Sequence, residues 1–272
     1  MGEYYMDRLV ELVKYIVLAI VQGIGEILPI SSSGHLFVFR KLMGVETNGV
    51  EIELVLHLAS LVALFIYYRK VIFSLIYGVY RFVFKKDENY IKDYRFVKGM
   101  IISLVPTCLA GYFLDDYLDF FFNYSFMIGL FLIINGINLY MIRNKENDKS
   151  IEELSFFSFL KIGIGQCFGL IPGISRSGSA LSMCYRENLN KEDSKKFTFI
   201  MLFPLVLGSI VLNIGDFTFN SNELVLLIIS FILTFMITMF SFNLLNKIIK
   251  HNKLHYFMYY CLILGILIMF IG

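Results

Sequence analysis

The sequence predicts an all-α integral membrane protein, and three observations support this fold class. Hydrophobic residues make up 57% of the chain and charged residues 17%, and the mean hydropathy is +0.70. Soluble domains contain roughly 45–50% apolar and about 25% charged residues. Several apolar segments are long enough to cross the roughly 30 Å hydrocarbon core of a bilayer. Two further apolar stretches are interrupted by Pro, Gly and Ser. We therefore expect about six spanning helices plus two re-entrant helix-loop-helix segments.

Composition also limits the partners and the number of domains. The chain of 272 residues is expected to form a single polytopic membrane domain, residues 1–272. A net charge of +2 gives no reason to expect a nucleic-acid partner. The first apolar stretch lacks the features of a cleavable signal peptide. The cysteines lie in apolar segments without metal-ligand spacing and are interpreted as buried hydrophobic residues: Cys108, Cys167, Cys184 and Cys261.

Uninterrupted apolar segments predict the spanning helices. They lie near residues 52 to 68, 97 to 114, 125 to 142, 197 to 213, 223 to 243 and 255 to 271. The broken stretches, 8 to 43 and 155 to 185, differ because a lipid-facing segment cannot leave backbone groups unpaired. Irregular backbone at this depth is tolerated where it is buried in protein or lines a wet cavity. Both stretches are therefore expected to dip into the bilayer.

Charge asymmetry predicts the topology. Lys and Arg crowd four connections, residues 81 to 98, 143 to 161, 186 to 196 and 247 to 253. They are absent from residues 44 to 50, 115 to 124 and 214 to 222. Basic connections face the cytoplasm, so stretch 155 to 185 should enter and leave on that side. Three full spans separate the two broken stretches if residues 70 to 84 lie along the cytoplasmic surface or only dip in, and an odd number of spans gives the two stretches opposite orientations. Arg8 and Lys14 argue against an outer N-terminus.

The two broken stretches look like copies of one motif. Residues 22 to 35 read QGIGEILPISSSGH, and residues 166 to 179 read QCFGLIPGISRSGS. They agree at Gln22/Gln166, Gly25/Gly169, Ile27/Ile171, Ile30/Ile174, Ser31/Ser175, Ser33/Ser177 and Gly34/Gly178. This duplication predicts an inverted repeat, with copies at about 8–142 and 155–272 and a site near the bilayer midplane at their interface.

The second copy carries the signature of a phosphate site. Arg176 lies in apolar sequence, where a guanidinium costs roughly 2.5–3.5 kcal/mol unless it faces a cavity or a partner. Ser175, Ser177 and Gly178 can offer hydroxyl and backbone donors, and a half-helix from about Ser179 would point its positive end at the anion. The planar guanidinium fork suits phosphate better than a halide.

The first copy carries the groups for hydrolysis. Gln22 and Glu26 share a helical face that points toward Ser31–Ser33, and His35 follows that loop. A hydroxyl, a carboxylate, an imidazole and a phosphate-binding Arg supply a nucleophile, a base and charge stabilisation. Glu26 could also hold a divalent cation, Mg²⁺ or Ca²⁺, or pair with Arg176 for structural reasons alone.

These residues give a predicted site. Its catalytic residues are Glu26, His35, Ser32 and Arg176, with Glu26 also the candidate metal ligand. Its substrate-binding residues are Gln22, Ser31, Ser33, Ser175, Ser177 and Gly178. Ser32, His35 and water stay open as the nucleophile. His57 is interpreted as structural because it lies inside a continuous span.

The two motifs resemble those of the bacterial undecaprenyl-diphosphate phosphatases, also called bacitracin-resistance proteins. The first family motif appears here as Gln22, Glu26, Leu28, Pro29, Ser31, Ser32, Gly34 and His35. The second appears as Pro172, Gly173, Ser175, Arg176, Ser177 and Gly178. Two positions depart from the usual pattern: Gln22 replaces an acidic residue, and Ala180 replaces the Thr that usually ends the second motif.

The resemblance implies a multi-pass enzyme of the bacterial plasma membrane that removes the terminal phosphate of undecaprenyl diphosphate. Such an enzyme recycles the lipid carrier of peptidoglycan synthesis and confers resistance to bacitracin. The implied partners are a polyprenyl diphosphate and the bilayer, with a homo-oligomer left open. From the residues alone a lipid-phosphate flippase or transporter is the alternative, because inverted re-entrant repeats are common in transport folds. A transporter does not need the Ser and His side chains, which favour the enzyme.

Overall fold

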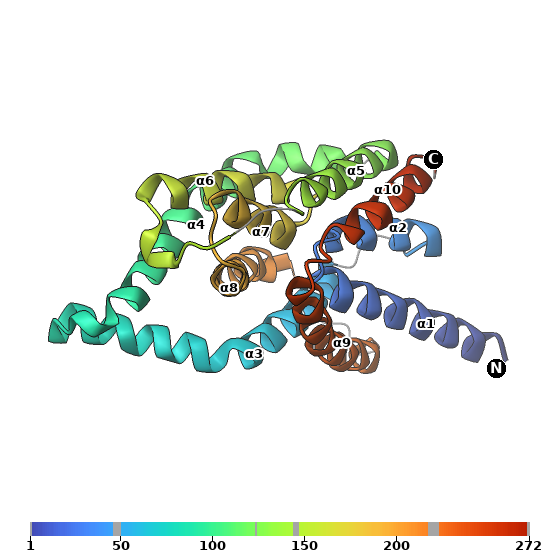
Figure 1. The fold of residues 1–272 in the computed structure, drawn as a ribbon. Helices are drawn as coiled ribbons and strands as arrows, with labels where there is room; N and C mark the ends of the chain where they lie inside the picture. The colour runs from blue at the N-terminus through green and yellow to red at the C-terminus, as the bar shows by residue number, and fades with distance from the viewer. Residues whose placement is uncertain (1, 46–49, 123, 144–146, 217–222, 271–272) are drawn as a thin grey trace.

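The computed structural model is a bundle of helices (Figure 1). It describes residues 2–45, 50–122, 124–143, 147–216 and 223–270. The helices are α1 (Gly2–Gly25), α2 (Ser32–Met43), α3 (Val50–Lys85), α4 (Ile91–Phe122), α5 (Ser125–Met141), α6 (Phe156–Cys167), α7 (Arg176–Arg186), α8 (Lys191–Asn213), α9 (Leu224–Lys250) and α10 (Tyr256–Met269). Within these ranges the only β pairing is an isolated bridge between Lys149 and Leu189. The predicted all-α class is confirmed.

Several helices are long and apolar enough to cross a membrane. They are Ile52–Lys85, Glu88–Leu114, Lys191–Asn213 and Leu224–Lys250. The shorter apolar helices are Ser125–Met141, Phe156–Leu170 and Tyr256–Met269. All the spans predicted from the sequence fall on helices, although those near 125 to 142 and 255 to 271 are in the shorter class. The chain is a multi-pass membrane protein.

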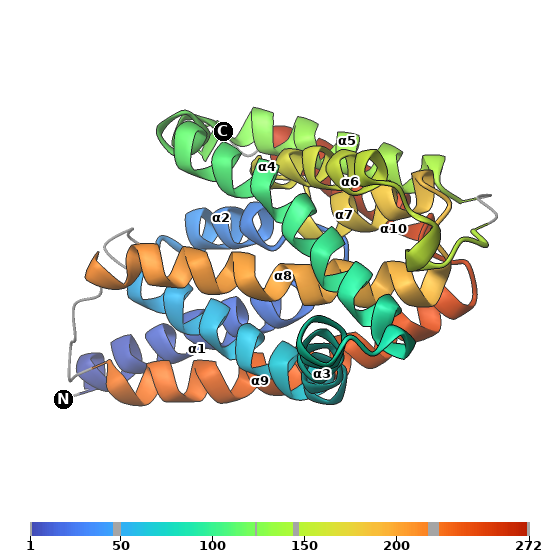
Figure 2. The same cartoon turned by 90° about the vertical axis from the view of Figure 1, so that its left-hand side faces the viewer.

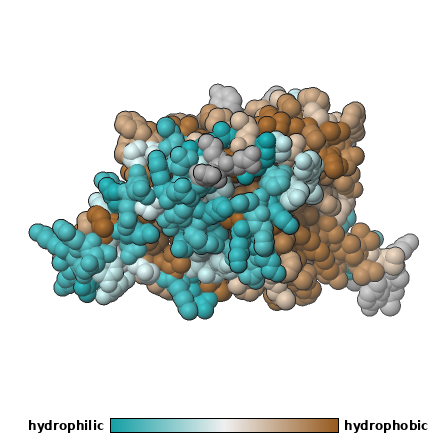
Figure 3. Space-filling model, in the orientation of Figure 1, coloured by the Kyte–Doolittle hydropathy of each residue, from teal (hydrophilic) through white to brown (hydrophobic). Residues whose placement is uncertain are grey.

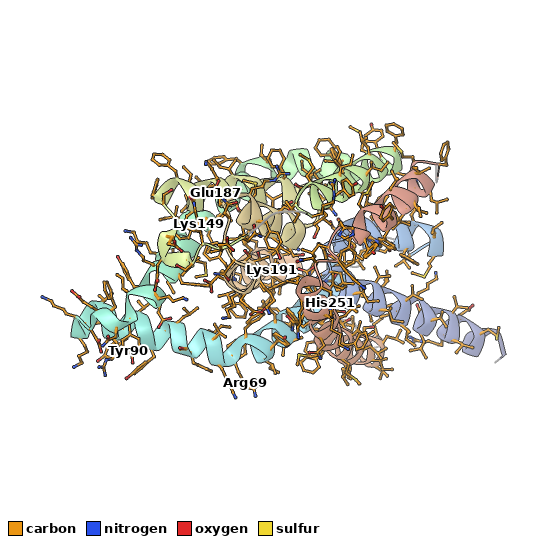
Figure 4. The ribbon with its side chains drawn as sticks, in the orientation of Figure 1. Arg69, Tyr90, Lys149, Glu187, Lys191 and His251 are labelled. Atoms are coloured by element: carbon orange, nitrogen blue, oxygen red, sulfur yellow. The ribbon has the colours of Figure 1, made fainter. Side chains whose placement is uncertain are left out.

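Helix α3 is longer than the predicted span at 52 to 68. It continues without a break to Lys85, so residues 70 to 84 are its C-terminal half and not a separate element. This half extends away from the bundle in Figure 1, between the positions of Arg69 and Tyr90 in Figure 4. α3 and α4 approach closely at Gly78, where a Cβ would lie 2.6 Å from the Cβ of Asp93 in α4.

Both broken stretches form helix-loop-helix hairpins, as predicted. In the first, the Lys14 Nζ of α1 donates to the carbonyl oxygen of Gly44 beyond α2 at 3.4 Å. In the second, the Lys149 N before α6 donates to the Asn188 oxygen beyond α7 at 3.0 Å, and the Asn190 N donates back to the Lys149 oxygen at 2.8 Å. The chain therefore leaves the second hairpin beside its entry, whereas in the first hairpin the end of α2 lies beside the middle of α1.

The two hairpins open toward opposite ends of the bundle. In Figure 2, α1 begins and α2 ends at the left, whereas α6 begins and α7 ends at the right. The right-hand end of Figure 2 faces the viewer in Figure 1, and hydrophilic residues gather at its centre and left in Figure 3. Lys149, Lys191 and His251 lie on this face in Figure 4. Three of the four connections rich in Lys and Arg thus share one end, whereas the connection 81 to 98 lies at the tip of the half of α3 that extends from the bundle. Residues 46–49, 123 and 217–222 of the basic-free connections lie outside the described ranges.

Helix packing brings the two hairpins together. α1 packs along α9, α6 packs along α4, and α5 packs along α10. The α5–α10 pair is closest at Gly129 and Gly265, where a Cβ on Gly129 would lie 2.4 Å from the Gly265 oxygen. Small residues allow this approach of two helix backbones. The close crossing fixes α5 and α10 beside the loops that join the arms of the hairpins.

Candidate active site

The two hairpin loops touch each other inside the bundle. The Gly173 N of the second loop donates to the Ser31 Oγ of the first at 3.2 Å. A Cβ on Gly34 would lie 3.1 Å from the Gly173 Cα, so the backbones meet where both residues are glycine. Gly173 has a φ of +98°, a conformation that L-residues with a side chain rarely adopt. The glycines of the two motifs therefore serve the contact between the loops.

Each loop begins its second helix with the same cap. The Ser31 Oγ accepts a hydrogen bond from the Gly34 N at 3.4 Å, and the Ser175 Oγ accepts one from the Gly178 N at 3.0 Å. A serine in this position satisfies one of the unpaired amides at a helix start. α7 consequently begins at Arg176, earlier than the half-helix expected from about Ser179.

The residue after each cap lies over a glycine. A Cβ on Gly25 would be 2.9 Å from the Ser32 Cα, and a Cβ on Gly169 would be 2.6 Å from the Arg176 Cα. Ser32 and Arg176 therefore occupy matched positions at the starts of α2 and α7. Their side chains reach the same acidic residue.

That residue is Glu26, which follows the last residue of α1 and is only 5% exposed. The Ser32 Oγ donates to its Oε2 at 2.7 Å, and the Gln22 Nε2 donates to the same oxygen at 3.2 Å. The Arg176 Nη2 lies 3.5 Å from Oε1. A buried carboxylate is tolerated when it has such partners. The hydroxyl of Ser32 points its proton at a carboxylate oxygen, as a nucleophile does beside its base.

A small polar pocket lies against this cluster. Its lining consists of Gly25, Glu26, Ser31, Ser32, Ser33, Gly169, Ile174, Ser175, Arg176 and Ser177. The lining thus joins hydroxyls from both loops, one carboxylate and one guanidinium that is 21% exposed. Two helices, α2 and α7, start beside it and direct backbone amides and their positive ends toward it. The donors in this lining suit an anionic group such as a phosphate, and the volume of the pocket in this structure, about 10 Å³, is close to that of one water molecule.

His35 lies beside the loop but faces away from Glu26. Its Nδ1 is 2.7 Å from the Ser31 carbonyl oxygen, and its Nε2 is 2.7 Å from the Tyr260 hydroxyl of α10. Because a carbonyl only accepts, Nδ1 carries the hydrogen and Nε2 accepts from Tyr260. Ser31 has a φ of +70°, which is uncommon for a residue other than glycine. His35 therefore holds a strained turn in place.

Three site residues were missed by the sequence analysis. Asn135 of α5 is fully buried; its Nδ2 donates to the Pro29 oxygen at 2.8 Å, and its Oδ1 accepts from the Ser175 N at 3.2 Å, so one amide ties both loops together. Tyr260 is the partner of His35. His57, interpreted as structural, lies 3.0 Å from the Gln22 Nε2 through its Nδ1. The signal for Asn135 and His57 was a lone polar residue inside an apolar span.

A larger cavity of about 460 Å³ adjoins the polar pocket. Ile174 lines both spaces, and Asn135 and Ser179 lie at the wall of the larger one. The remaining lining comes from α5, α6 and α7 and is mainly apolar: Ile134, Asn138, Lys161, Ile164, Gly165, Phe168, Met183 and Arg186. An apolar space therefore leads away from the anion pocket.

The fold and the site define a multi-pass membrane protein with a buried Glu–Ser–Arg cluster suited to chemistry on a phosphate group. A family model described as bacitracin resistance protein BacA matches residues 15–267. The chain belongs to this family, which confirms the resemblance of its motifs.

Named relatives match over nearly the full chain. It is 34% identical over 263 residues to an undecaprenyl-diphosphatase of Oceanobacillus iheyensis, covering 95% of this chain and 96% of the relative. It is 36% identical over 258 residues to an undecaprenyl-diphosphatase of Methanococcus vannielii, covering 94% and 98%. Identity to an undecaprenyl-diphosphatase 2 of Bacillus thuringiensis is 32% over 265 residues, covering 96% and 98%.

Proposed function

We propose that this protein is a membrane phosphatase that hydrolyses undecaprenyl diphosphate to undecaprenyl phosphate and inorganic phosphate. The observation that carries the proposal is the meeting of Ser32, Glu26 and Arg176 at one pocket, with distances of 2.7 Å and 3.5 Å to the carboxylate. Relatives that share about a third of its residues over almost the whole length are named undecaprenyl-diphosphatases. The geometry supplies a nucleophile, a base and a cation for this reaction.

We assign phosphate binding to the second loop. Arg176 offers a planar fork for two phosphate oxygens, and Ser175 and Ser177 line the same pocket at the start of α7. The 3.5 Å separation between the Arg176 Nη2 and the Glu26 Oε1 is a loose ion pair. An arriving phosphate would draw the guanidinium toward itself.

The first loop carries the bond-making step. The Ser32 Oγ attacks the terminal phosphorus while Glu26 takes its proton, and the bond from that phosphorus to the bridging oxygen breaks. Undecaprenyl phosphate leaves, and water then hydrolyses the phosphoserine to release inorganic phosphate and restore Ser32. Ser32 is favoured over His35 because it lines the pocket and lies 2.7 Å from Glu26, whereas both ring nitrogens of His35 have other partners.

A divalent cation, Mg²⁺ or Ca²⁺, would bind together with the diphosphate. In the part of the chain that the structure describes, no group of three or more His, Cys, Asp or Glu side chains could hold a metal ion. Mg²⁺ commonly takes only one or two carboxylates and completes its shell with phosphate oxygens and water. Glu26 would supply the carboxylate, and Gln22 is buried with its Oε1 lacking a hydrogen-bond partner among the described residues. The cation would neutralise charge on the substrate phosphates.

The prenyl chain would occupy the apolar cavity between α5, α6 and α7. This cavity of about 460 Å³ shares Ile174 with the phosphate pocket, so a lipid could place its headgroup in one space and the start of its chain in the other. Apolar cavities with a few polar groups are typical ligand sites. The rest of a long chain would lie in the bilayer.

We further propose that the chain is an inverted repeat in the bacterial plasma membrane, with the site near the midplane. In this repeat α1 would correspond to α6, and α4 would correspond to α9. The packing of α1 on α9 and the packing of α6 on α4 would then be equivalent contacts. The serine caps at Ser31 and Ser175, which each accept a hydrogen bond from the amide three residues later, support the same correspondence. The repeats would be residues 8–142 and 155–272.

Phosphate release from farnesyl diphosphate and undecaprenyl diphosphate tests this function. Purified protein with Mg²⁺ or Ca²⁺ should release phosphate from both, and chelation of the cation should abolish the release. The opposite hairpins also suit a lipid-phosphate transporter. If the protein releases no phosphate but moves lipid phosphate across liposome membranes, the transporter is correct and the phosphatase proposal is wrong.

A further inference from the structure

We propose that His57 is a positioning residue for the catalytic carboxylate and that it acts through Gln22. The proposal rests on the phosphatase function and adds a residue to its machinery. His57 belongs to α3, outside both hairpins. Its Nδ1 lies 3.0 Å from the Gln22 Nε2 but 3.8 Å from the nearest oxygen of Glu26. The first distance is a hydrogen bond and the second is too long for one, so the contact with Gln22 is the one that can hold Glu26 in place.

The hydrogen bonds around Gln22 have one consistent arrangement. The amide nitrogen of Gln22 has two hydrogens, and it lies 3.2 Å from the Glu26 Oε2 and 3.0 Å from the His57 Nδ1. One hydrogen goes to each partner when Nδ1 is the unprotonated nitrogen of a neutral imidazole. The reversed amide would place its oxygen 3.2 Å from a carboxylate oxygen, an unfavourable pairing of two acceptors. His57 and Glu26 therefore select the same orientation of the amide.

This orientation matters for the reacting oxygen of Glu26. Oε2 is the oxygen that accepts from the Ser32 hydroxyl at 2.7 Å, and the Gln22 amide binds the same atom. An amide that turned freely would let the carboxylate rotate between Ser32 and Arg176. Misplacement of a reacting group by about 1 Å can lower a rate roughly 100-fold. His57 thus keeps Oε2 directed at the nucleophile without touching the substrate.

Kinetics of His57 variants in nanodiscs test the inference. His57→Ala should lower kcat about 10- to 30-fold and change KM less than about twofold, since catalysis and not binding loses its geometry. His57→Asn places an amide oxygen near the former Nδ1 and should restore kcat to within about threefold of wild type. Ser60→Ala, one turn further along α3, serves as the control and should leave kcat unchanged. Thermal melting of each variant shows whether the fold is kept.

A double substitution tests the route through Gln22. In the Gln22→Leu background, adding His57→Ala should lower kcat by less than about twofold further, because the two residues act as a unit. Full activity of His57→Ala, failure of His57→Asn to restore kcat, or additive losses in the double variant would each overturn the inference. These outcomes require an active wild type. A wild type that releases no phosphate would instead overturn the phosphatase function.

Discussion

The loop between α1 and α2 and the loop between α6 and α7 share a capping hydrogen bond and a close glycine contact but present different side chains. Each begins a helix with a serine cap, and each places the next residue over a glycine. In the first loop that next residue is Ser32, and in the second it is Arg176. Both side chains reach Glu26, from opposite sides of the contact between the loops. The position that presents the proposed nucleophile in the first loop presents a cation in the second.

Gln22 and Gln166, which occupy matched positions in the two motifs, also differ in what they contact. Gln22 binds Glu26 and His57 within the cluster. Gln166, its counterpart, accepts instead from the Thr107 Oγ1 of α4 at 3.4 Å, and it does not line the polar pocket. The first glutamine therefore belongs to the cluster around Glu26, whereas the second ties α6 to a neighbouring helix. Identical residues at matched positions do not have identical roles here.

The largest effect is expected from removing the proposed nucleophile of the first loop. Ser32→Ala should lower kcat by roughly 10⁴-fold, because no hydroxyl would remain beside Glu26. Phosphate release in single-turnover assays measures the loss, and acid quenching of the wild type should trap a phosphoserine. Ser33→Ala is the control and should lose less than about tenfold. A Ser32→Ala variant within tenfold of wild type would point to water or His35 as the attacking group.

Removing the cation of the second loop should have the next largest effect. Arg176→Ala should lower kcat/KM roughly 10³-fold, the loss typical when a donor to transition-state charge is removed. Arg176→Lys should recover only part of it, since an ammonium cannot make the bidentate contact. Initial rates with farnesyl diphosphate over a range of concentrations provide the measurement. Equal activity of the Lys variant and wild type would contradict the bidentate contact.

Alanine substitutions at two glycines should lower the free energy of unfolding by different amounts. Gly173 lies at the contact between the loops, whereas Gly44 requires glycine only because its φ is positive. Gly173→Ala should destabilise by about 3 kcal/mol or more, because its Cβ would lie 2.6 Å from the Ile128 oxygen at a φ of +98°. Gly44→Ala has a φ of +57° and nothing within 4 Å, so about 1 kcal/mol is expected. Thermal melting in detergent compares the two. Similar melting temperatures would mean that the loops do not pack as closely as described.

The smallest effect concerns the support of the first loop. Tyr260→Phe removes the hydroxyl that donates to the His35 Nε2 at 2.7 Å and should lower kcat by about 3- to 10-fold, in line with one lost hydrogen bond. Tyr259→Phe, at an exposed neighbouring position, is the matched control and should be silent. If Tyr260→Phe abolished activity, His35 would have a direct chemical role and not a supporting one.

The sequence predicted most of the fold because apolar length and broken apolar stretches are local signals. Hairpins at 8 to 43 and 155 to 185 followed from Pro, Gly and Ser in apolar surroundings. The extent of α3 did not follow, since residues 70 to 84 continue the same helix to Lys85 and were expected to lie along the surface or only dip in. Length and hydropathy alone do not show which half of a long helix such as α3 packs in the bundle and which half extends away from it.

The motifs likewise predicted Glu26, Ser32 and Arg176, because unusual polar residues were gathered in short windows. Asn135, Tyr260 and His57 had no such neighbours. Each lies on a separate helix, α5, α10 or α3, and reaches the loops only through tertiary packing. The direction of His35 also depended on tertiary structure, since its partner Tyr260 is distant in sequence.

The placement of Glu26 and Arg176 in different hairpins has a consequence for the synthesis of the protein. Glu26 leaves the ribosome long before Arg176, because all of α2 to α6 lies between them. During this interval the carboxylate lacks the guanidinium that lies 3.5 Å from it in the folded structure, and a buried carboxylate without such a partner is costly. Insertion of the second hairpin is therefore the step that brings Arg176 to Glu26 and completes the lining of the polar pocket.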